Sequence, residues 1–317
     1  MSNATPSRLG QALATGDANA FFLKKFSGEI LSVFQRENMM LNMVQKRTLT
    51  QGKSASFPVT GKTTSSYHTI GNEITGDAIK HQEKIINLDD ILLSSAFIGE
   101  IDELKNHFSV RNIYSGELAR ALSTRVDKHL LSLSVLASQG SANISGDTAG
   151  GLEITDADCD TNMDSMIASI FEGIQRLDEN DVPSTDRVIV VSPDIYYKLA
   201  NVDKLVSRDF SDNNGDFGRG TVVAIGGVPV MKSNTAVDTF TDQSSDSTTG
   251  QNNTYTGDFQ YHKAVLFHKS ALGCLMAKNL VTEVTYDPRR LGTLMTCRMV
   301  MGAGILRPES AVSIKTQ

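Results

Sequence analysis

Two short motifs in the sequence could bind a phosphate group, because each resembles the end of a P-loop. They are Gly52-Lys53-Ser54 and Gly61-Lys62-Thr63. A P-loop also needs an earlier glycine, five residues before its second one, so that backbone amides can surround the phosphate. Those positions hold Arg47 and Ser56, and at neither motif does a buried strand lead into a helix. Neither motif therefore predicts a nucleotide-binding site.

The acidic residues and histidines also lack the spacing of a metal-binding or catalytic site. The run Asp156–Asp160 resembles the start of an EF-hand loop, but Thr161 replaces the required glycine and Ile167 the bidentate glutamate. The run is better explained as an acidic approach to a helix that begins at Met163. HExxH pairs, a GxSxG elbow and a complete dinucleotide-binding glycine loop are absent. We expect no metal, no cofactor and no enzymatic activity.

The composition is that of a folded, soluble protein. The chain has 317 residues, of which 40% are hydrophobic and 21% charged, and this balance argues against wholesale disorder. The net charge of −6 and the absence of tryptophan argue against a protein that coats nucleic acid or stacks on its bases. No stretch approaches the ~18 apolar residues of a membrane span, and no signal peptide is visible. The three cysteines lie far apart, which excludes a disulfide framework.

Charge is distributed unevenly along the chain. Residues 1–60 carry seven basic and three acidic residues, whereas residues 139–217 carry five basic and sixteen acidic ones. One interpretation is that these are ordinary solvated faces. The other is that the basic end of one copy attracts the acidic middle of another and steers self-association. Charge alone does not choose between them.

The N-terminal third of the sequence predicts a helix followed by a projecting arm. Phe22, Phe26 and Ile30 recur on one face of a helix expected over residues 20–40. Apolar residues then alternate from Ala55 to Val59, as in a strand, and a second apolar stretch follows at residues 84–93. The long polar segment between them is unusual in a compact domain. We therefore expect residues 52–93 to form a two-stranded arm that needs a surface to lie against.

The rest of the chain predicts a mixed α+β domain. Its longest periodic segment, residues 110–137, is expected to be a single helix of ~40 Å. Residues 234–258 form a Ser/Thr/Asn/Asp/Gly-rich segment that we expect to be an exposed surface loop. The other expected elements are helices at 163–177 and 193–199, strands at 187–191 and 264–268, a strand pair at 222–225 and 228–231, and a long hairpin at 280–286 and 294–301.

Collinear motifs give the chain a likeness to a known family. It resembles the major capsid proteins of short-tailed bacteriophages, the T-odd podophages or autographiviruses. The segments that carry the resemblance are Gly16-Asp17, AFFLKKFSGEILSVF (Ala20–Phe34), GKSASFPVTG (Gly52–Gly61), Gly71–Glu73, His81–Ile86, Asp186–Val188 with Pro193 and Tyr196, Phe267–Gly273 and Gly302–Glu309. Residues 201–220 and 234–258 match the family poorly.

The resemblance implies the Hong Kong 97 type capsid fold, an α+β fold with characteristic subdomains. On this sequence they correspond to an N-terminal arm (1–50), an E-loop (51–95), a P-domain with a long spine helix (96–154), an A-domain (155–270) and the terminal β-hairpin of the P-domain (271–317). The shells of encapsulin nanocompartments share this fold, so a nanocompartment shell protein is the alternative interpretation.

The implied function is self-assembly into hexamers and pentamers of an icosahedral head that encloses the double-stranded DNA genome with weak contact. The implied partners are other copies of the chain, a scaffolding protein during procapsid assembly and a portal protein at one vertex, without a membrane. The implied location is the virion, after assembly in the bacterial cytoplasm. The candidate residues for contacts between subunits are Phe22, Phe26, Lys53, Phe57, Lys62, Tyr67, Glu73, Arg289 and Arg290.

Overall fold

The structure is a computed structural model that describes residues 39–63, 65–74, 76, 78–101, 110–202, 215–216, 221–222, 224–246 and 250–317. The chain divides into two compact units. The described part of the first unit lies within residues 89–126 and 277–301, and that of the second within residues 39–88, 127–276 and 302–317. Helices and strands are mixed along the chain, as the sequence predicts.

A six-stranded sheet forms the centre of the second unit, with strand order β5-β14-β11-β6-β10-β9. The strands are β5 (Leu152–Thr155), β14 (Ala311–Lys315), β11 (His262–His268), β6 (Arg187–Val191), β10 (Val228–Lys232) and β9 (Ala224–Ile225). Every residue of β6 is buried, as expected for an apolar strand inside a sheet. It pairs with β11 in antiparallel and with β10 in parallel orientation.

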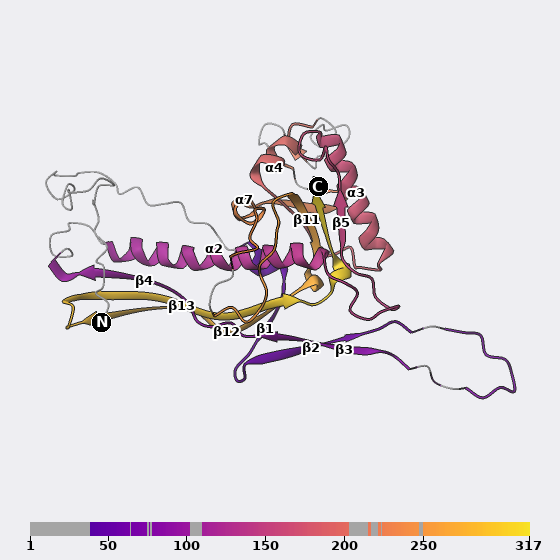
Figure 1. Cartoon of the computed structure of the whole chain (residues 1–317), viewed down its shortest axis with the longest axis horizontal. Helices are drawn as coiled ribbons and strands as arrows, with labels where there is room; N and C mark the ends of the chain where they lie inside the picture. The colour runs from indigo at the N-terminus through magenta and orange to yellow at the C-terminus, as the bar shows by residue number, and fades with distance from the viewer. Residues whose placement is uncertain are drawn as a thin grey trace. The chain divides into compact units, whose positions relative to one another are not determined.

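Helix α3 (Met163–Glu179) packs along this sheet and is drawn beside β5 and β11 in Figure 1. The helix begins after Asn162, whose side chain accepts a hydrogen bond from the backbone N–H of Asp164 at 3.1 Å. Gly173 allows a close approach to the sheet, since a Cβ there would lie 3.2 Å from a methyl group of Leu266. The apolar face of α3, including Met166 and Ile170, is buried in the core of this unit.

A four-stranded sheet of order β1-β12-β13-β4 contains the long strands β12 (Leu272–Asp287) and β13 (Gly292–Ile305). Within the first unit, β13 pairs in antiparallel orientation with β4 (Leu92–Gly99). Within the second unit, β1 (Gln45–Thr48) runs parallel to the start of β12. Strands β12 and β13 therefore have residues in both units.

Helix α2 (Val110–Ser138) is 29 residues long and also contributes to both units. In the second unit its Asp127 holds the start of the described chain, where the 3₁₀ helix η1 (Met40–Met43) begins. The two carboxylate oxygens of Asp127 accept hydrogen bonds from the backbone N–H groups of Met39 and Met40, each at 3.1 Å. Burial raises the pKa of Asp127 to about 6, although these hydrogen bonds oppose the shift.

Several shorter elements complete the described chain. They are the hairpin of β2 (Ser54–Thr60) and β3 (His81–Asn87), helices α4 (Pro193–Leu199) and α7 (Asn234–Thr239), the strand pair β7 (Gly215–Asp216) and β8 (Thr221–Val222), and the 3₁₀ helices η2 (Lys269–Ala271) and η3 (Pro308–Ser310). In the part of the chain that the structure describes, no helix combines the length and apolar character needed to cross a bilayer.

Most of the elements expected from the sequence are confirmed, but β12 begins eight residues before the strand expected at 280–286, and β13 ends four residues after the strand expected at 294–301. The expected arm is correct in type but shorter, because Leu92 and Leu93 belong to β4 and pair with β13. The long helix, α3, α4, β6, β11, the turn between β9 and β10, and the terminal hairpin lie where the sequence places them. The expected helix at residues 20–40 lies almost wholly outside the described residues.

The prediction of an exposed loop at residues 234–258 is only partly correct, because described residues after 239 are largely irregular and many are exposed, but others are buried. This segment begins with α7 and carries buried side chains, among them Thr239, Gln243 and Tyr255. The Tyr255 ring stacks on His129 of α2 at 4.2 Å between centroids, and its hydroxyl accepts a hydrogen bond from the backbone of Ala303 at 3.1 Å. The segment is polar in composition, but its buried polar groups find partners inside and outside it; Gln243, for example, donates a hydrogen bond to the Thr239 carbonyl at 2.5 Å.

Candidate functional site

The β2–β3 hairpin is the element that the sequence predicts as a contact arm. Its register runs from Ser54 opposite Asn87 to Thr60 opposite His81. The base of the hairpin is built into a small core, in which Ala55 and Ile86 pack with Leu275 and Leu306. This anchorage makes the base part of the second unit.

Two asparagines outside the hairpin bind its base. The side-chain amides of Asn252 and Asn253 donate hydrogen bonds to the backbone carbonyls of Leu88 and Asn87, at 2.7 and 2.8 Å. Within the hairpin itself, the Leu88 N–H donates a hydrogen bond to the Lys53 carbonyl at 2.8 Å. The carbonyls at the end of β3 are therefore satisfied by a segment that is distant in the sequence.

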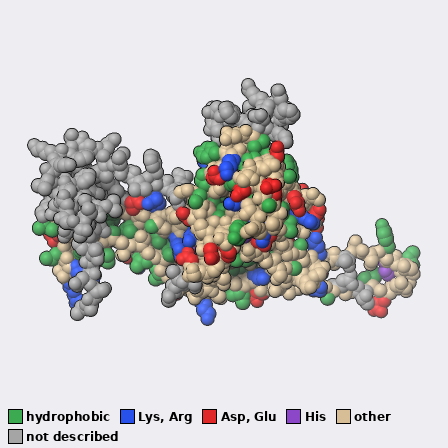
Figure 2. Space-filling view, turned by 45° about the horizontal axis from the view of Figure 1, so that its top comes forward, with side chains coloured by type: hydrophobic (Ala, Val, Ile, Leu, Met, Phe, Trp, Pro, Cys, Tyr) green, Lys and Arg blue, Asp and Glu red, His purple; other side chains and the backbone are tan. Residues whose placement is uncertain are grey.

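The connection between β2 and β3 exposes apolar side chains. In Figure 1 it continues beyond the ends of both strands as an extended loop, and Figure 2 shows hydrophobic side chains along it. Tyr67 and Ile70 are almost fully exposed, and Ile74 is 79% exposed. Because these side chains contribute nothing to the described core, their burial requires another surface.

A second exposed feature is the tip of the β12–β13 hairpin in the first unit. Its turn is organised by Asp287, whose carboxylate accepts a hydrogen bond from the backbone of Arg289 at 3.0 Å and pairs with Arg290 at 3.8 Å. Leu291 closes the turn in the left-handed conformation, with φ of 49°. On the adjoining strand, half-exposed Tyr286 donates a hydrogen bond from its hydroxyl to Glu100 at 2.7 Å.

The candidate contact residues thus fall on separate surfaces. Lys53, Phe57, Lys62, Tyr67 and Glu73 all lie on the β2–β3 hairpin or its connection. Of these, Phe57 is half-buried beneath the Arg47 guanidinium, which lies 5.5 Å from its ring centre, and Lys62 pairs with Asp181. Arg289 and Arg290 are exposed at the β12–β13 turn, and Phe22 and Phe26 lie outside the described residues.

The motifs with possible phosphate or metal chemistry have structural roles. Gly52-Lys53-Ser54 leads into β2 and Gly61-Lys62-Thr63 follows it, so neither motif opens a helix. Asp156 accepts hydrogen bonds from the hydroxyls of Ser165 and Ser169 on α3, at 2.5 and 2.9 Å. Within the described ranges, no group of three or more His, Cys, Asp or Glu side chains is arranged to hold a metal ion.

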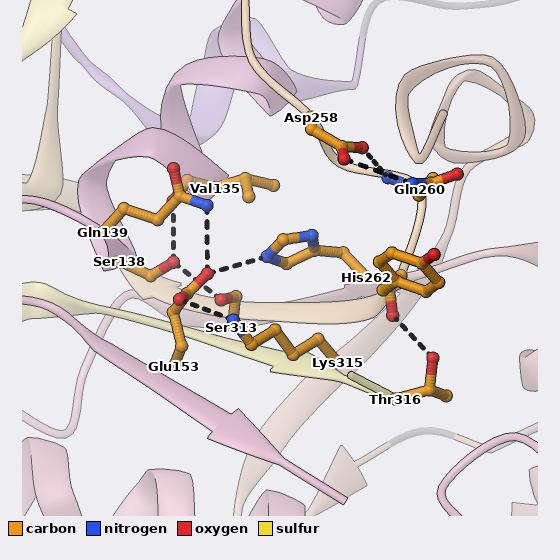
Figure 3. Close-up of polar contacts among 11 residues, drawn as sticks. Val135, Ser138, Gln139, Glu153, Asp258, Gln260, His262, Ser313, Lys315 and Thr316 are labelled. Carbon is orange, nitrogen blue, oxygen red and sulfur yellow. Dashed lines mark hydrogen bonds and ion pairs between the residues drawn. The ribbon is translucent and has the colours of Figure 1, made fainter. Parts of the chain in front are cut away.

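One polar cluster that the sequence analysis missed links α2 to the six-stranded sheet. Figure 3 shows Glu153 of β5 between Gln139, His262 and Lys315. Its carboxylate accepts hydrogen bonds from these side chains at 3.0, 3.1 and 2.8 Å respectively. Burial alone would raise the pKa of Glu153, but the hydrogen bonds from Lys315, Gln139 and His262 hold it below its ordinary value. Glu153 is therefore the ionised centre of this cluster.

Burial lowers the pKa of His262, and the hydrogen bond to Glu153 only partly opposes the shift. The imidazole is therefore neutral at pH 7 and donates through Nε2. Its Nδ1 is buried without a hydrogen-bond partner in the described part of the chain. A proton added at Nδ1 would thus be buried unsatisfied, which is costly.

This geometry predicts that the second unit loses stability in acid through His262. The unfolded chain binds a proton near pH 6.5, whereas the folded chain binds it only at lower pH, so this contribution is present above pH 6.5 and lost as the pH falls. The variant His262→Gln keeps a donor near the Nε2 position but does not titrate. Its urea midpoint should change less than that of the wild type between pH 7.5 and 5.0. The variant of exposed His81, His81→Gln, is the control, and equal pH slopes for all three proteins would contradict the prediction.

The deciding observation on identity is a family match. The model of the Gp10A-like major capsid protein family matches residues 56–315. The chain belongs to this family. The major capsid protein of Escherichia phage T7 is 28% identical to it over 331 residues, which cover 95% of this chain and 93% of the T7 protein.

Solved structures agree with the family match. The capsid structure of Cyanophage P-SCSP1u superposes on this capsid protein with a TM-score of 0.83 at 33% identity, and the match covers 99% of both chains. The mature capsid of bacteriophage PhiM1 gives a TM-score of 0.77 at 20% identity, with 95% and 94% coverage. The latter likeness concerns the fold alone.

The resemblance noted in the sequence is therefore confirmed. This major capsid protein has the Hong Kong 97 type fold, belongs to the phage head shell and is a structural protein of the virion. The alternative of a nanocompartment shell is not supported, because the family and the relatives are phage capsid proteins.

Proposed function

We propose that this capsid protein forms hexamers and pentamers, and that the β2–β3 hairpin with its connection is the arm by which one copy holds the next. The observation that carries the proposal is the exposed apolar set Tyr67, Ile70 and Ile74 on a connection whose base is firmly anchored. Such contacts can close into rings, and the rings are repeated around the shell. Because each subunit makes many contacts at once, the shell is stable even where each single contact is weak.

The described elements support the subdomain assignment made from the resemblance. The β2–β3 hairpin lies within the proposed E-loop (51–95), and α2 supplies the spine helix of the proposed P-domain segment (96–154). Helices α3 and α4 with β6, β10 and β11 fall within the proposed A-domain (155–270). The long strands β12 and β13 belong to the terminal hairpin (271–317). The N-terminal arm is assigned to residues 1–50.

The proposed contacts between subunits follow from exposure. Lys53, Tyr67, Glu73, Arg289 and Arg290 are exposed, and Arg290 also pairs with Asp287 within its own turn. The other proposed contact residues are Phe22, Phe26, Lys62 and Phe57, of which Phe57 is half-buried.

The proposed partners of the shell are a scaffolding protein during assembly, a portal protein at one vertex and the enclosed DNA. Weak contact with DNA is supported by the net charge of −6, because a strongly basic wall would bind DNA through counterion release. Exposed Lys46 and Arg47 on β1 already interact locally, with Asn42 and with the Ser56 carbonyl, at 2.9 and 2.8 Å. These local contacts reduce their availability to phosphates.

The purified chain is expected to elute as capsomers or shells rather than as a monomer. Size-exclusion chromatography with light scattering, followed by electron microscopy of the large fractions, measures this directly. Rings of five or six subunits and closed shells are the expected particles. A monodisperse monomer at every protein concentration and salt concentration tested would contradict the proposal.

A further inference from the structure

The point where the β2–β3 hairpin ends is marked by two lysine–aspartate pairs. The last backbone hydrogen bond joins the Gly61 N–H to the Lys80 carbonyl at 2.9 Å. Beside it, the Lys80 ammonium lies 3.3 Å from a carboxylate oxygen of Asp147, and the Lys62 ammonium lies 2.5 Å from one of Asp181. At each end of the connection, one ion pair therefore ties the hairpin to another part of the second unit.

Both aspartates are held by the local backbone. The Asp147 N–H donates to the Ile144 carbonyl at 3.1 Å, and Ile144 is buried. Asp181 follows the end of α3, has a φ of 59°, and donates its N–H to the Asp178 carbonyl at 3.0 Å. Asp and Asn tolerate this left-handed conformation better than most residues. The backbone at both aspartates is thus anchored, which keeps the two carboxylates near the lysines of the hairpin.

The approach of Asp147 also constrains the residue type on the hairpin. A Cβ at position 61 would lie 2.6 Å from a carboxylate oxygen of Asp147, so only glycine fits without movement. The second of the two GK[ST] motifs therefore has a structural explanation: its glycine admits Asp147 and its lysine reaches Asp181.

We propose that the pairs Lys62–Asp181 and Lys80–Asp147 are positioning contacts that set the direction in which the connection leaves the hairpin. They thereby present Tyr67, Ile70 and Ile74 to a second copy of the chain. The inference rests on the proposed role of the hairpin as the contact arm and names the residues that orient it.

The energetics favour a role in orientation over a role in stability. The paired side chains are 63% and 76% exposed for Lys62 and Asp181, and such surface pairs contribute little to folding. The two pairs instead hold both ends of the connection before a neighbour binds, and this preorganisation reduces the entropy lost on binding. The pairs should therefore affect assembly far more than subunit stability.

A charge exchange tests the first pair. Lys62→Asp and Asp181→Lys, made singly, each place like charges together and should slow shell formation at least about threefold, with the melting temperature nearly unchanged. The double variant restores an opposite pair and should recover the wild-type rate within about twofold. Asp181→Lys carries the same backbone strain in the single and the double variant, so their difference isolates the pair.

The charge-matched control is Lys278→Asp, which changes an exposed lysine on β12 that is not among the proposed contact residues and should assemble as wild type. Single variants that assemble at the wild-type rate, or a double variant that stays as slow as the singles, would overturn the inference. Removal of residues 63–76 distinguishes the positioning role of the ion pairs from the contact role of the arm. If that deletion blocks assembly while the charge variants do not, only the positioning role fails. If the deletion variant assembles normally, the contact role of the arm fails as well.

Discussion

Removing residues 63–76 is expected to leave a folded subunit that no longer forms shells. The deletion leaves four residues between Gly61 and Lys80, enough for a hairpin turn that preserves the pairing of β2 with β3. The small core of Ala55, Ile86, Leu275 and Leu306 lies at the other end of the hairpin and is not touched. Circular dichroism and thermal melting should therefore match the wild type closely.

The expected loss of assembly is large because the deleted segment carries exposed apolar surface. Full burial of side chains such as Tyr67, Ile70 and Ile74 stabilises a contact by about 1.5–3 kcal/mol each, before the entropic cost of ordering them. The contact recurs at every subunit of a shell, so its loss is multiplied. Light scattering and electron microscopy should detect no closed particles.

A second variant separates the side chains from the length of the connection. Tyr67, Ile70 and Ile74 can be replaced together by serine, which keeps the length and the lysine–aspartate pairs. This variant should also assemble poorly while its melting temperature stays unchanged. A serine variant that assembles normally would refute the contact role of these side chains, and a deletion variant that fails to fold would instead place the segment in the core of the subunit.

The secondary structure of this protein could largely be predicted because its signals are local. The apolar run of β6 and Pro193 at the first turn of α4 each define an element within a few residues. The alternation from Ala55 to Val59 likewise identified β2, since its inward residues are buried. The start of α3 at Met163 was predicted from the preceding acidic run, whereas the cap itself, Asn162, was not singled out.

The segment 234–258 could not be predicted from composition, because composition does not reveal the partners of a polar side chain. Tyr255 is only 3% exposed, and its stacking partner His129 lies on a helix far away in the sequence. Asn252 and Asn253 are typical of surface loops, yet here they satisfy carbonyls at the end of β3. Only the tertiary fold brings these groups together.

For the candidate contact residues, too, local features could be predicted from the sequence and distant partners could not. Residue types and the long polar connection predicted the hairpin and made Lys62 a contact candidate, but nothing near position 62 indicates Asp181, which lies 119 residues away in the sequence. The cluster around Glu153 was missed for the same reason, since its partners lie 14, 109 and 162 residues away in the sequence. Long-range pairs of this kind leave no periodic or spacing signal in a single sequence.

Replacing Gly302 by alanine is expected to be among the most damaging single changes in the second unit. Gly302 belongs to the tripeptide Gly302-Ala303-Gly304 near the end of β13. A Cβ at position 302 would lie 1.9 Å from the carbonyl oxygen of Asn87 and 3.1 Å from the Cα of Leu88. Both neighbours are backbone atoms, and the Asn87 carbonyl is also the acceptor for Asn253, so neither can move without breaking the base of the hairpin.

The same tripeptide supplies a graded control. A Cβ at Gly304 would meet the side chain of Ile86 at 3.1 Å, which can shift by a few tenths of an ångström, and a Cβ at Gly76 would meet nothing within 4 Å. Overpacking against backbone costs at least about 2–3 kcal/mol, contact with a movable side chain about 1 kcal/mol, and a change in open space less than about 0.5 kcal/mol. Urea denaturation of the three variants should therefore rank Gly302→Ala well below Gly304→Ala, and Gly76→Ala close to the wild type. If Gly302→Ala accumulates only as insoluble protein while the other two remain soluble, the ranking also holds. Equal stability of Gly302→Ala and Gly76→Ala would show that β13 and the end of β3 do not approach as closely as the structure describes.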